Sequence, residues 1–374
     1  MPMRADPVTL LAEAWVHDLN PVIVHIAGPF AVRWYGLAYL AGFALGYFLL
    51  KQLAKRGTLR IPPHAAIDAL FLLALGAIVG GRIGYALLYQ PSLLGFTDTP
   101  PFWRLLALNE GGMASHGGML GVAAATLLIA RRHKVPCLHI ADAVALAAPA
   151  GLLLGRLANF INGELLGRII AGPGEAAPWY AVRFPTEMSE RPEEWAATLT
   201  PGQIDRFEAT IAPIVRELDT LAREPVPAEA VLATVVARIQ AGDDQLTQQI
   251  APFLTARHPS QLYQALAEGL IVFIALAVVW IKPRRAGVVS GWFLIVYGAG
   301  RIATEFYRLP DVGVSGALGL SRGQLLSAAM IAAGFALIGF TRVRKTPVMG
   351  GLAHSRPPAP PNDPSTPRAP SKSD

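Results

Sequence analysis

The stretch IADAVALAAPAGLLL, residues 140–154, is followed directly by GRLANFINGELLGR, residues 155–168. The first part is apolar and long enough to lie within a membrane. The second part brings two arginines, two asparagines and a glutamate together at the membrane edge. A surface that faces lipid does not tolerate this density of polar groups, because each would lose its hydrogen bonds to water. The polar segment 155–168 is therefore expected to face a polar cavity, and its arginines suit an anionic ligand.

The composition of the whole chain points to the same class of protein. Of its 374 residues, 53% are hydrophobic and only 16% are charged, whereas a soluble protein carries about 25% charged residues. The net charge of +6 comes from basic residues that cluster at the ends of the apolar runs. This pattern indicates membrane topology with anionic lipid nearby, and it argues against a nucleic-acid partner. The sequence predicts an all-α polytopic membrane protein.

About seven transmembrane helices are expected from the apolar runs. Basic clusters follow the odd-numbered runs, which places the N-terminus outside and the C-terminus in the cytoplasm. The third and fourth runs are short, so one of them is expected to be tilted or partly re-entrant. The runs cover residues 31–50, 66–89, 117–131, 140–154, 261–281, 288–306 and 323–340.

Three further segments flank or interrupt these runs. Residues 1–29 are expected to form an N-terminal interfacial arm. Residues 169–257 are a polar insert, expected to fold as a small extracytoplasmic domain with helical periodicity at 204–217 and 228–239. The Pro-rich tail 346–374 is expected to be disordered in the cytoplasm. Between these segments lie two membrane regions, residues 30–168 with the first four helices and the polar segment, and residues 258–345 with the last three.

Arginines on the outer side run against the topological bias and need another explanation. Tyr297, Arg301, Glu305 and Arg308 are spaced four, four and three apart, so on a helix they share one face. Guanidinium groups hold phosphate through paired hydrogen bonds, and a partly dry site strengthens the contact. The alternative is that Arg301 and Glu305 form a structural ion pair while the other arginines anchor the interface. For any single arginine, this structural alternative is about as good as phosphate binding. It is weaker for the whole set, which also includes Arg156 and Arg168.

His116 lies in Ser115-His116-Gly117-Gly118, where the third run begins on the outer side. Imidazole is the natural general base near neutral pH, although a single histidine is more often a structural residue. A serine-hydrolase interpretation is disfavoured, because neighbours in sequence rarely face each other and no GxSxG is present. Arg82, inside the second run, is expected to pair internally or to line the cavity.

Six blocks of the sequence, in order, resemble the bacterial prolipoprotein diacylglyceryl transferase family. The resemblance covers about residues 22–340. The long insert, the Pro-rich tail and Leu166, where the family commonly has an aromatic residue, depart from it. The blocks are RWYG at 33–36, GGRIGY at 80–85, SHGG at 115–118, GRLANFINGELLGR at 155–168, HPSQLY at 258–263 and the residues from Tyr297 to Arg308.

The resemblance implies a reaction. The family transfers the sn-1,2-diacylglyceryl group of phosphatidylglycerol to the lipobox cysteine thiol of a prolipoprotein, with glycerol-1-phosphate as the leaving product. This is the first step of lipoprotein maturation. It implies a bacterial cytoplasmic (inner) membrane protein whose active site faces the outer leaflet, with no cofactor and no metal. The residues fit, because a thiol must become a thiolate to attack carbon and arginines would hold the departing phosphate.

The resemblance also implies roles for single residues. His116 matches an essential histidine and is a candidate base for the thiol, and Arg156 and Arg301 match essential arginines that we assign to the lipid phosphate. Tyr297 is expected to assist proton transfer or to position the thiol, and Asn159 to orient the headgroup. The rival interpretation is a transporter or binding protein for an anionic lipid or solute, which lacks support from any visible internal repeat. The remaining expected site residues are Tyr35 and Gly167, with Glu164 and Glu305 holding arginines in place.

Overall fold

The computed structural model describes residues 14–27, 30–98, 100–107, 111–309 and 321–353. The chain forms two compact units. The first consists of residues 1–44, 149–274 and 294–333, and the second of residues 45–148, 275–293 and 334–374. The N-terminal part of the expected interfacial arm, residues 1–13, and most of the Pro-rich tail, residues 354–374, lie outside the described residues.

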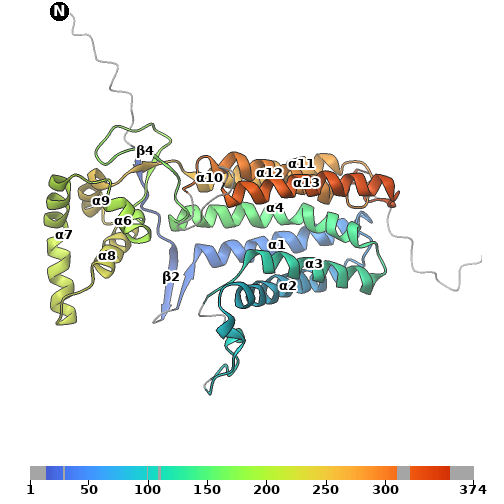
Figure 1. Cartoon of the computed structure of the whole chain (residues 1–374), viewed down its shortest axis with the longest axis horizontal. Coiled ribbons are helices and arrows are strands. Elements are labelled where there is room, and N and C mark those ends of the chain that lie inside the picture. The colour runs from blue at the N-terminus through green and yellow to red at the C-terminus, as the bar shows by residue number, and fades with distance from the viewer. Residues whose placement is uncertain (1–13, 28–29, 99, 108–110, 310–320, 354–374) are drawn as a thin grey trace, which may run out of the picture. The chain divides into compact units, whose positions relative to one another are not determined.

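Long helices fall where the sequence predicts apolar runs (Figure 1). Within the described residues, five helices are long and apolar enough to cross a membrane, namely those at Trp34–Lys55, Ala65–Leu88, Cys137–Asn162, Ser260–Val279 and Gly323–Val343. The predicted third and sixth runs are helical but are not among these five, so the count of seven spans stays a prediction. The helices are α1 (Trp34–Lys55), α2 (Ala65–Leu88), α3 (Ser115–His133), α4 (Cys137–Asn162), α10 (Ser260–Gln264), a π-helix (Ala265–Ile271), α11 (Val272–Val279), α12 (Val288–Glu305) and α13 (Arg322–Val343).

Helix α4 is longer than the sequence predicts, so the expectation that this run is short was wrong. The helix continues through Arg156 and Asn159, where the hydropathy falls, and it ends at Asn162. It ends there because Gly163 adopts a positive φ of 69°, a conformation that glycine takes at no steric cost. The Gly163 amide then donates to the Phe160 carbonyl at 2.9 Å. Arg156 and Asn159, three residues apart, thus lie on one face of the last turns of α4.

A four-stranded sheet in the first unit joins segments that are far apart in the sequence. Its strand order is β1-β5-β6-β4, and the strands are β1 (Trp15–Val16), β4 (Ile169–Ala171), β5 (Val182–Arg183) and β6 (Ala256–Arg257). Strand β4 directly follows the polar segment 155–168, and β6 directly precedes α10. The sheet therefore fixes where both of these site segments begin or end. A separate hairpin, β2 (Val22–Ala27) with β3 (Phe30–Arg33), leads into α1.

The polar insert contains helices around a hydrophobic core of its own. The two helices predicted here are present as α7 (Pro201–Ala222) and α8 (Ala228–Gln240), each longer than expected. Phe207, Val235, Ile239 and Trp195 are among the buried residues that pack between them. The insert thus buries apolar area without any contribution from the long apolar helices. Its shorter helices are α5 (Glu187–Glu190), α6 (Pro192–Ala196), α9 (Asp244–Ile250) and the 3₁₀ turn Ala251–Phe253.

In the second unit, α2 and α3 pack with their backbones in contact. Glycines from both helices meet along this contact, and a Cβ added at Gly80 or Gly121 would overlap with carbonyl oxygens of the facing helix. Small residues of this kind let helices approach closely in a membrane, where van der Waals packing holds them together. A loop with 3₁₀ turns at Pro91–Leu94 and Arg104–Leu106 connects α2 with α3.

The beginning of the predicted tail takes part in this unit. Strand β8 (Val348–Met349) pairs with β7 (Arg284–Arg285), and Met349 is buried. The expectation of disorder from residue 346 onward therefore does not apply to these first residues, because Val348 and Met349 pair with β7 and the apolar side chain of Met349 is buried.

Candidate functional site

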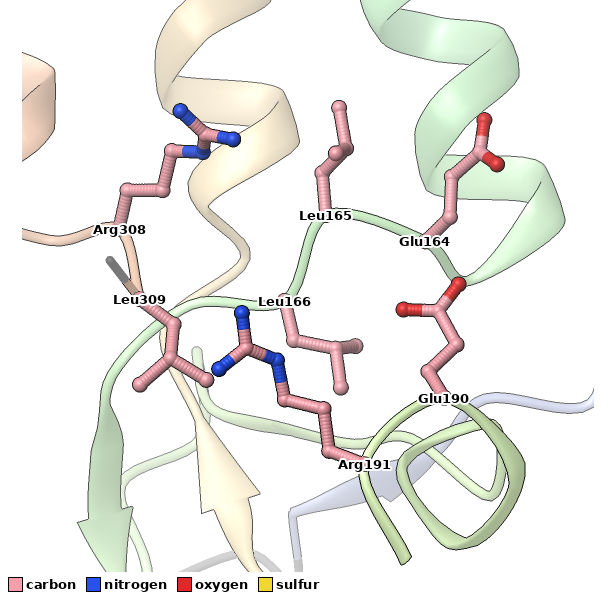
Figure 2. Close-up of a pocket in the computed structure, with 7 residues that line it drawn as sticks. All are labelled: Glu164, Leu165, Leu166, Glu190, Arg191, Arg308 and Leu309. Atoms are coloured by element: carbon pink, nitrogen blue, oxygen red, sulfur yellow. The ribbon is translucent and has the colours of Figure 1, made fainter. Parts of the chain in front are cut away.

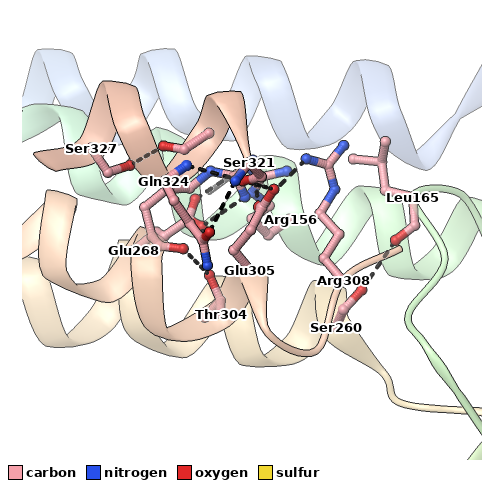
Figure 3. A network of polar contacts seen from close by, with 12 residues as sticks. Arg156, Leu165, Ser260, Glu268, Thr304, Glu305, Arg308, Ser321, Gln324 and Ser327 are labelled. Atoms are coloured by element: carbon pink, nitrogen blue, oxygen red, sulfur yellow. Dashed lines mark hydrogen bonds and ion pairs between the residues drawn. The ribbon is translucent and has the colours of Figure 1, made fainter. Parts of the chain in front are cut away.

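Arg156 and Arg301 meet at a single buried carboxylate. Helix α4 carries Arg156, α12 carries Arg301, and the π-helix carries Glu268, which is fully buried. Arg156 Nη2 lies 3.0 Å from Glu268 Oε2 (Figure 3). Arg301 Nη1 lies 3.5 Å from Glu268 Oε1. The Thr304 hydroxyl donates a third contact to Glu268 at 3.2 Å. One negative charge therefore holds two guanidinium groups side by side.

A second carboxylate continues this network along α12. Glu305 Oε2 lies 3.3 Å from Arg301 Nη2. It also lies 3.9 Å from Arg308 Nη1, and Ser321 Oγ donates to Glu305 Oε1 at 3.0 Å (Figure 3). The expectation that Glu305 holds arginines in place fits this geometry. Arg308 lies beyond the end of α12, so it reaches Glu305 from the following turn and not from the helix face that its spacing predicts.

Tyr297 also belongs to this group. It lies on α12 one turn before Arg301, and it shares a hydrogen bond with the side chain of Arg156. Because the guanidinium can only donate, the tyrosine oxygen is the acceptor. The structure thus brings Tyr297, Arg156 and Arg301 together from two helices that are far apart in the sequence.

The loop after α4 is tied to α10. Asn159 Nδ2 donates to Glu164 Oε1, so Glu164 contacts Asn159, whereas the sequence predicts an arginine partner for it. Gln261 Nε2 donates to the Glu164 carbonyl at 2.6 Å, and Ser260 Oγ donates to the Leu165 carbonyl at 3.1 Å. The HPSQLY block therefore holds the polar segment 155–168 in place, which is a structural use for its serine and its glutamine.

Gly167 lies where two other chain segments pass close by. It forms an antiparallel bridge with Arg308, and Arg257 Nη1 donates to its carbonyl at 3.2 Å. A Cβ at position 167 would overlap with the carbonyl oxygen of His258. The glycine is therefore required for close backbone approach, a steric reason that is independent of any contact with substrate. Arg257 in turn forms a buried ion pair with Glu187 of the insert at 2.6 Å.

A polar cavity of about 140 Å³ lies beside this loop (Figure 2). The insert contributes Glu190 and Arg191 to its wall, which the sequence analysis did not single out. Burial, and second the nearby charge of Glu164, raise the pKa of Glu190 to about 7. Glu190 remains open to solvent on one side, which screens part of this effect. The cavity is lined by Glu164, Leu165, Leu166, Glu190, Arg191, Arg308 and Leu309.

Tyr35 and His116 occupy helix starts. Tyr35 lies in the first turn of α1 and accepts a hydrogen bond from Tyr39 at 3.4 Å. His116 is the second residue of α3 and is exposed. It belongs to the second unit, whereas Tyr35 and the arginine network belong to the first.

Arg82 pairs internally, which is one of the two outcomes that the sequence predicts. It is buried and donates to five backbone carbonyls in the loop before α3, among them Leu105 at 2.9 Å and Ala107 at 2.8 Å. This loop leads directly to His116, so Arg82 fixes the chain that precedes the histidine.

Sequence reasoning missed Glu268, which is the centre of the network. The only signal was a single carboxylate inside the predicted fifth span, where an ionisable residue is costly unless it has a partner. The π-helix that carries it gives no simple pattern in the sequence, and segments of this kind are frequent at functional sites.

Two comparisons with known proteins bear on the family of this chain. The model of the family described as prolipoprotein diacylglyceryl transferase matches residues 21–340. The chain belongs to this family. A protein of Bdellovibrio bacteriovorus named phosphatidylglycerol–prolipoprotein diacylglyceryl transferase is 40% identical over 341 residues, covering 86% of this chain and 93% of its own length. Proteins with the same name are 35% identical in Rhodospirillum rubrum, covering 87% and 94%, and 39% identical in Burkholderia multivorans, covering 86% and 94%.

The membership settles the broad class. The chain is an enzyme of the prolipoprotein diacylglyceryl transferase family, and its apolar helices make it a multi-pass membrane protein. The match extends across all six blocks that carry the resemblance, from Arg33 to Arg308.

Proposed function

We propose that this chain transfers the sn-1,2-diacylglyceryl group of phosphatidylglycerol to the lipobox cysteine thiol of prolipoproteins and releases glycerol-1-phosphate. Its curated relatives carry the name of this activity. The names also favour an enzyme over the rival transporter or binding protein for an anionic lipid or solute. No protein cysteine takes part, because the nucleophile is the thiol of the acceptor.

The observation that carries the proposal is the arginine network. It alternates Arg156, Glu268, Arg301, Glu305 and Arg308, so three arginines against two glutamates leave a net charge of +1. A phosphodiester carries one negative charge and would neutralise this excess. The side chains of Arg156 and Arg301 are 19% and 16% exposed. Their contacts to a phosphate are thus poorly screened and correspondingly strong.

The bond that breaks joins a glyceryl carbon to a phosphate oxygen. The reaction requires a nucleophile at the carbon and stabilisation of negative charge at the oxygen. The acceptor thiolate attacks the glyceryl carbon, a carbon–sulfur bond forms, and the electron pair of the carbon–oxygen bond leaves on the phosphate oxygen. Arginines that already surround the phosphate stabilise the charge that develops there without reorganising. We assign this role to Arg156 and Arg301.

The thiol must lose its proton before or during the attack. We assign His116 as the general base, because imidazole is the side chain most often used for proton transfer near neutral pH and this one is exposed. Tyr297 positions the thiol or relays the proton beside Arg156. We assign Asn159 and Tyr35 to the headgroup, while Glu164 orients Asn159 and Glu305 orients Arg301. Gly167 contributes by letting the polar segment pack closely against its neighbours.

The proposal includes a location. Basic residues follow the predicted odd-numbered spans, so the N-terminus and the insert 169–257 are assigned outside the bacterial cytoplasmic (inner) membrane. The arginine network then lies toward the outer leaflet, where a prolipoprotein presents its cysteine. Labelling of single cysteines introduced in the insert with a membrane-impermeant reagent tests this orientation. Labelling only after the membrane is opened would contradict it.

Incubation of the purified chain with phosphatidylglycerol and a lipobox peptide tests the activity directly. We expect a peptide heavier by one diacylglyceryl group in mass spectrometry, together with free glycerol-1-phosphate in equal amount. Binding of phosphatidylglycerol without either product would favour the rival interpretation.

His116 has its own test. We expect His116→Ala to lose most of the transfer rate at pH 7 and to recover part of it at high pH, where the thiol ionises by itself. Transfer at the wild-type rate across the whole pH range would exclude His116 as the base.

A further inference from the structure

Helix α10 and the π-helix carry a line of buried polar side chains. Gln261, Gln264 and Glu268 are spaced three and four residues apart, so they share one face, and all three are fully buried. Such groups are hydrogen-bonded in nearly all native proteins, because a buried polar group without a partner is destabilising. The partner of each member therefore indicates what that member does.

Two of the three have protein partners. Gln261 donates through its amide nitrogen to the carbonyl of Glu164, in the loop after α4, while its amide oxygen has no hydrogen-bond partner among the described residues. Glu268 binds the two arginines that we assign to the lipid phosphate. Gln264 lies between them, about 6 Å along the helix axis from Glu268. Neither its amide nitrogen nor its amide oxygen has a hydrogen-bond partner among the residues that the structure describes.

The chemistry of an amide restricts the missing partner. Gln264 offers a donor and an acceptor at one place, and a hydroxyl group can use both at once. A phosphate oxygen or an ester carbonyl can use only the donor. The headgroup of phosphatidylglycerol carries two hydroxyls on the glycerol attached to its phosphate, a few covalent bonds from the group that the arginines hold. A hydroxyl there would satisfy the amide.

We propose that Gln264 reads the headgroup of the lipid donor by hydrogen-bonding a hydroxyl of its terminal glycerol, so that it determines specificity among anionic phospholipids. The inference rests on the proposed function. It separates two tasks within the site, since the arginines recognise a phosphodiester of any kind and Gln264 recognises what is attached to it. A site built to hydrogen-bond a hydroxyl strongly disfavours an analogue that lacks it.

The test compares two lipids that differ at this hydroxyl. The full chain is reconstituted with phosphatidylglycerol as donor and with phosphatidylethanol as competitor, which keeps the single charge and both acyl chains but has no headgroup hydroxyl. In Gln264→Met, which conserves volume, we expect kcat/KM for phosphatidylglycerol to fall about ten-fold or more. We expect the inhibition constant of phosphatidylethanol to change less than about two-fold, because the phosphate contacts remain.

Two further variants make the result specific. Gln264→Glu keeps the size but loses the donor and adds an unpaired charge in a buried site beside an anionic lipid, so we expect a loss at least as large as with methionine. Gln261→Met removes an amide that is bonded to the protein, and we expect it to weaken both lipids together because the loop after α4 loses its anchor. Unchanged kinetics of Gln264→Met, or equal weakening of both lipids by it, would overturn the inference. A wild-type chain that forms no thioether product would instead refute the proposed function.

Discussion

Neutralising Glu268 is the most direct perturbation of the arginine network. Glu268→Gln keeps the shape of the side chain and one acceptor oxygen but removes the charge that Arg156 and Arg301 share. At 3.0 and 3.5 Å, each ion pair is worth about 5 kcal/mol before desolvation at an effective dielectric constant of about 20. Breaking a buried ion pair costs about 3–5 kcal/mol net. The hydrogen bond that the glutamine oxygen can still accept favours the lower end of this range.

A loss of about 3 kcal/mol corresponds to a factor of about 100 in rate. If the two guanidinium groups move apart, this loss appears in the transition state, where they hold the leaving phosphate. We therefore expect kcat/KM of Glu268→Gln to fall about 100-fold in the thioether-forming assay, with phosphatidylglycerol and a lipobox peptide as substrates. Glu268 touches no reacting atom in this account, so it is a positioning residue.

The matched control is an exposed ion pair. Glu217 lies 2.6 Å from Arg238 in the insert, and its side chain is 50% exposed. Such pairs contribute about 0–1 kcal/mol, so we expect Glu217→Gln to stay within about two-fold of the wild type. The reasoning would be refuted if Glu268→Gln kept more than about a third of the wild-type kcat/KM while folding normally, because the arginines would then hold their positions without the carboxylate.

Three other outcomes are expected. Gly167→Ala should abolish most activity and lower the yield of folded protein, since its Cβ would overlap with a carbonyl oxygen. Gly155→Ala should be nearly neutral, because nothing lies within 4 Å of the added atom; equal effects of the two would contradict the steric argument. Cys137→Ser should retain full transfer, and an inactive variant would mean that a protein cysteine takes part. Glu190 has its pKa raised to about 7, chiefly by burial, so its ionisation destabilises the fold as pH rises from about 4 to above 7. Glu190→Gln should therefore unfold at a higher temperature than wild type at pH 8 and at the same temperature near pH 3, whereas a difference that persists at pH 3 would have another cause.

The positions of the long helices follow closely from the sequence. An apolar run with basic residues at one end has one stable arrangement in a membrane, because every backbone group must be paired within the segment. The end of α4 was predicted too early for a related reason. Arg156 and Asn159 lower the local hydropathy, but their side chains find polar partners inside the protein, so the helix continues to Asn162.

The site was predictable only in part. Spacing alone placed Tyr297, Arg301 and Glu305 on one face of a helix, and the structure has them there. The partner that unites this face with Arg156 was not predictable, since Glu268 is 112 residues away from Arg156 in the sequence. The wall that the insert adds through Glu190 was missed for the same reason. Contacts between segments far apart in the chain leave no local pattern in either segment.

The backbone contact between α2 and α3 has a consequence for His116. Gly117, the next residue, faces Gly80 and Gly84 so closely that no side chain fits between the two backbones. The first turn of α3 can therefore neither slide nor rotate against α2 without separating the two backbones. The imidazole can then move only by rotation about its two side-chain torsions. The conformational entropy that is lost in positioning the proposed base is thus lost once, when the helices assemble, and not again in each turnover.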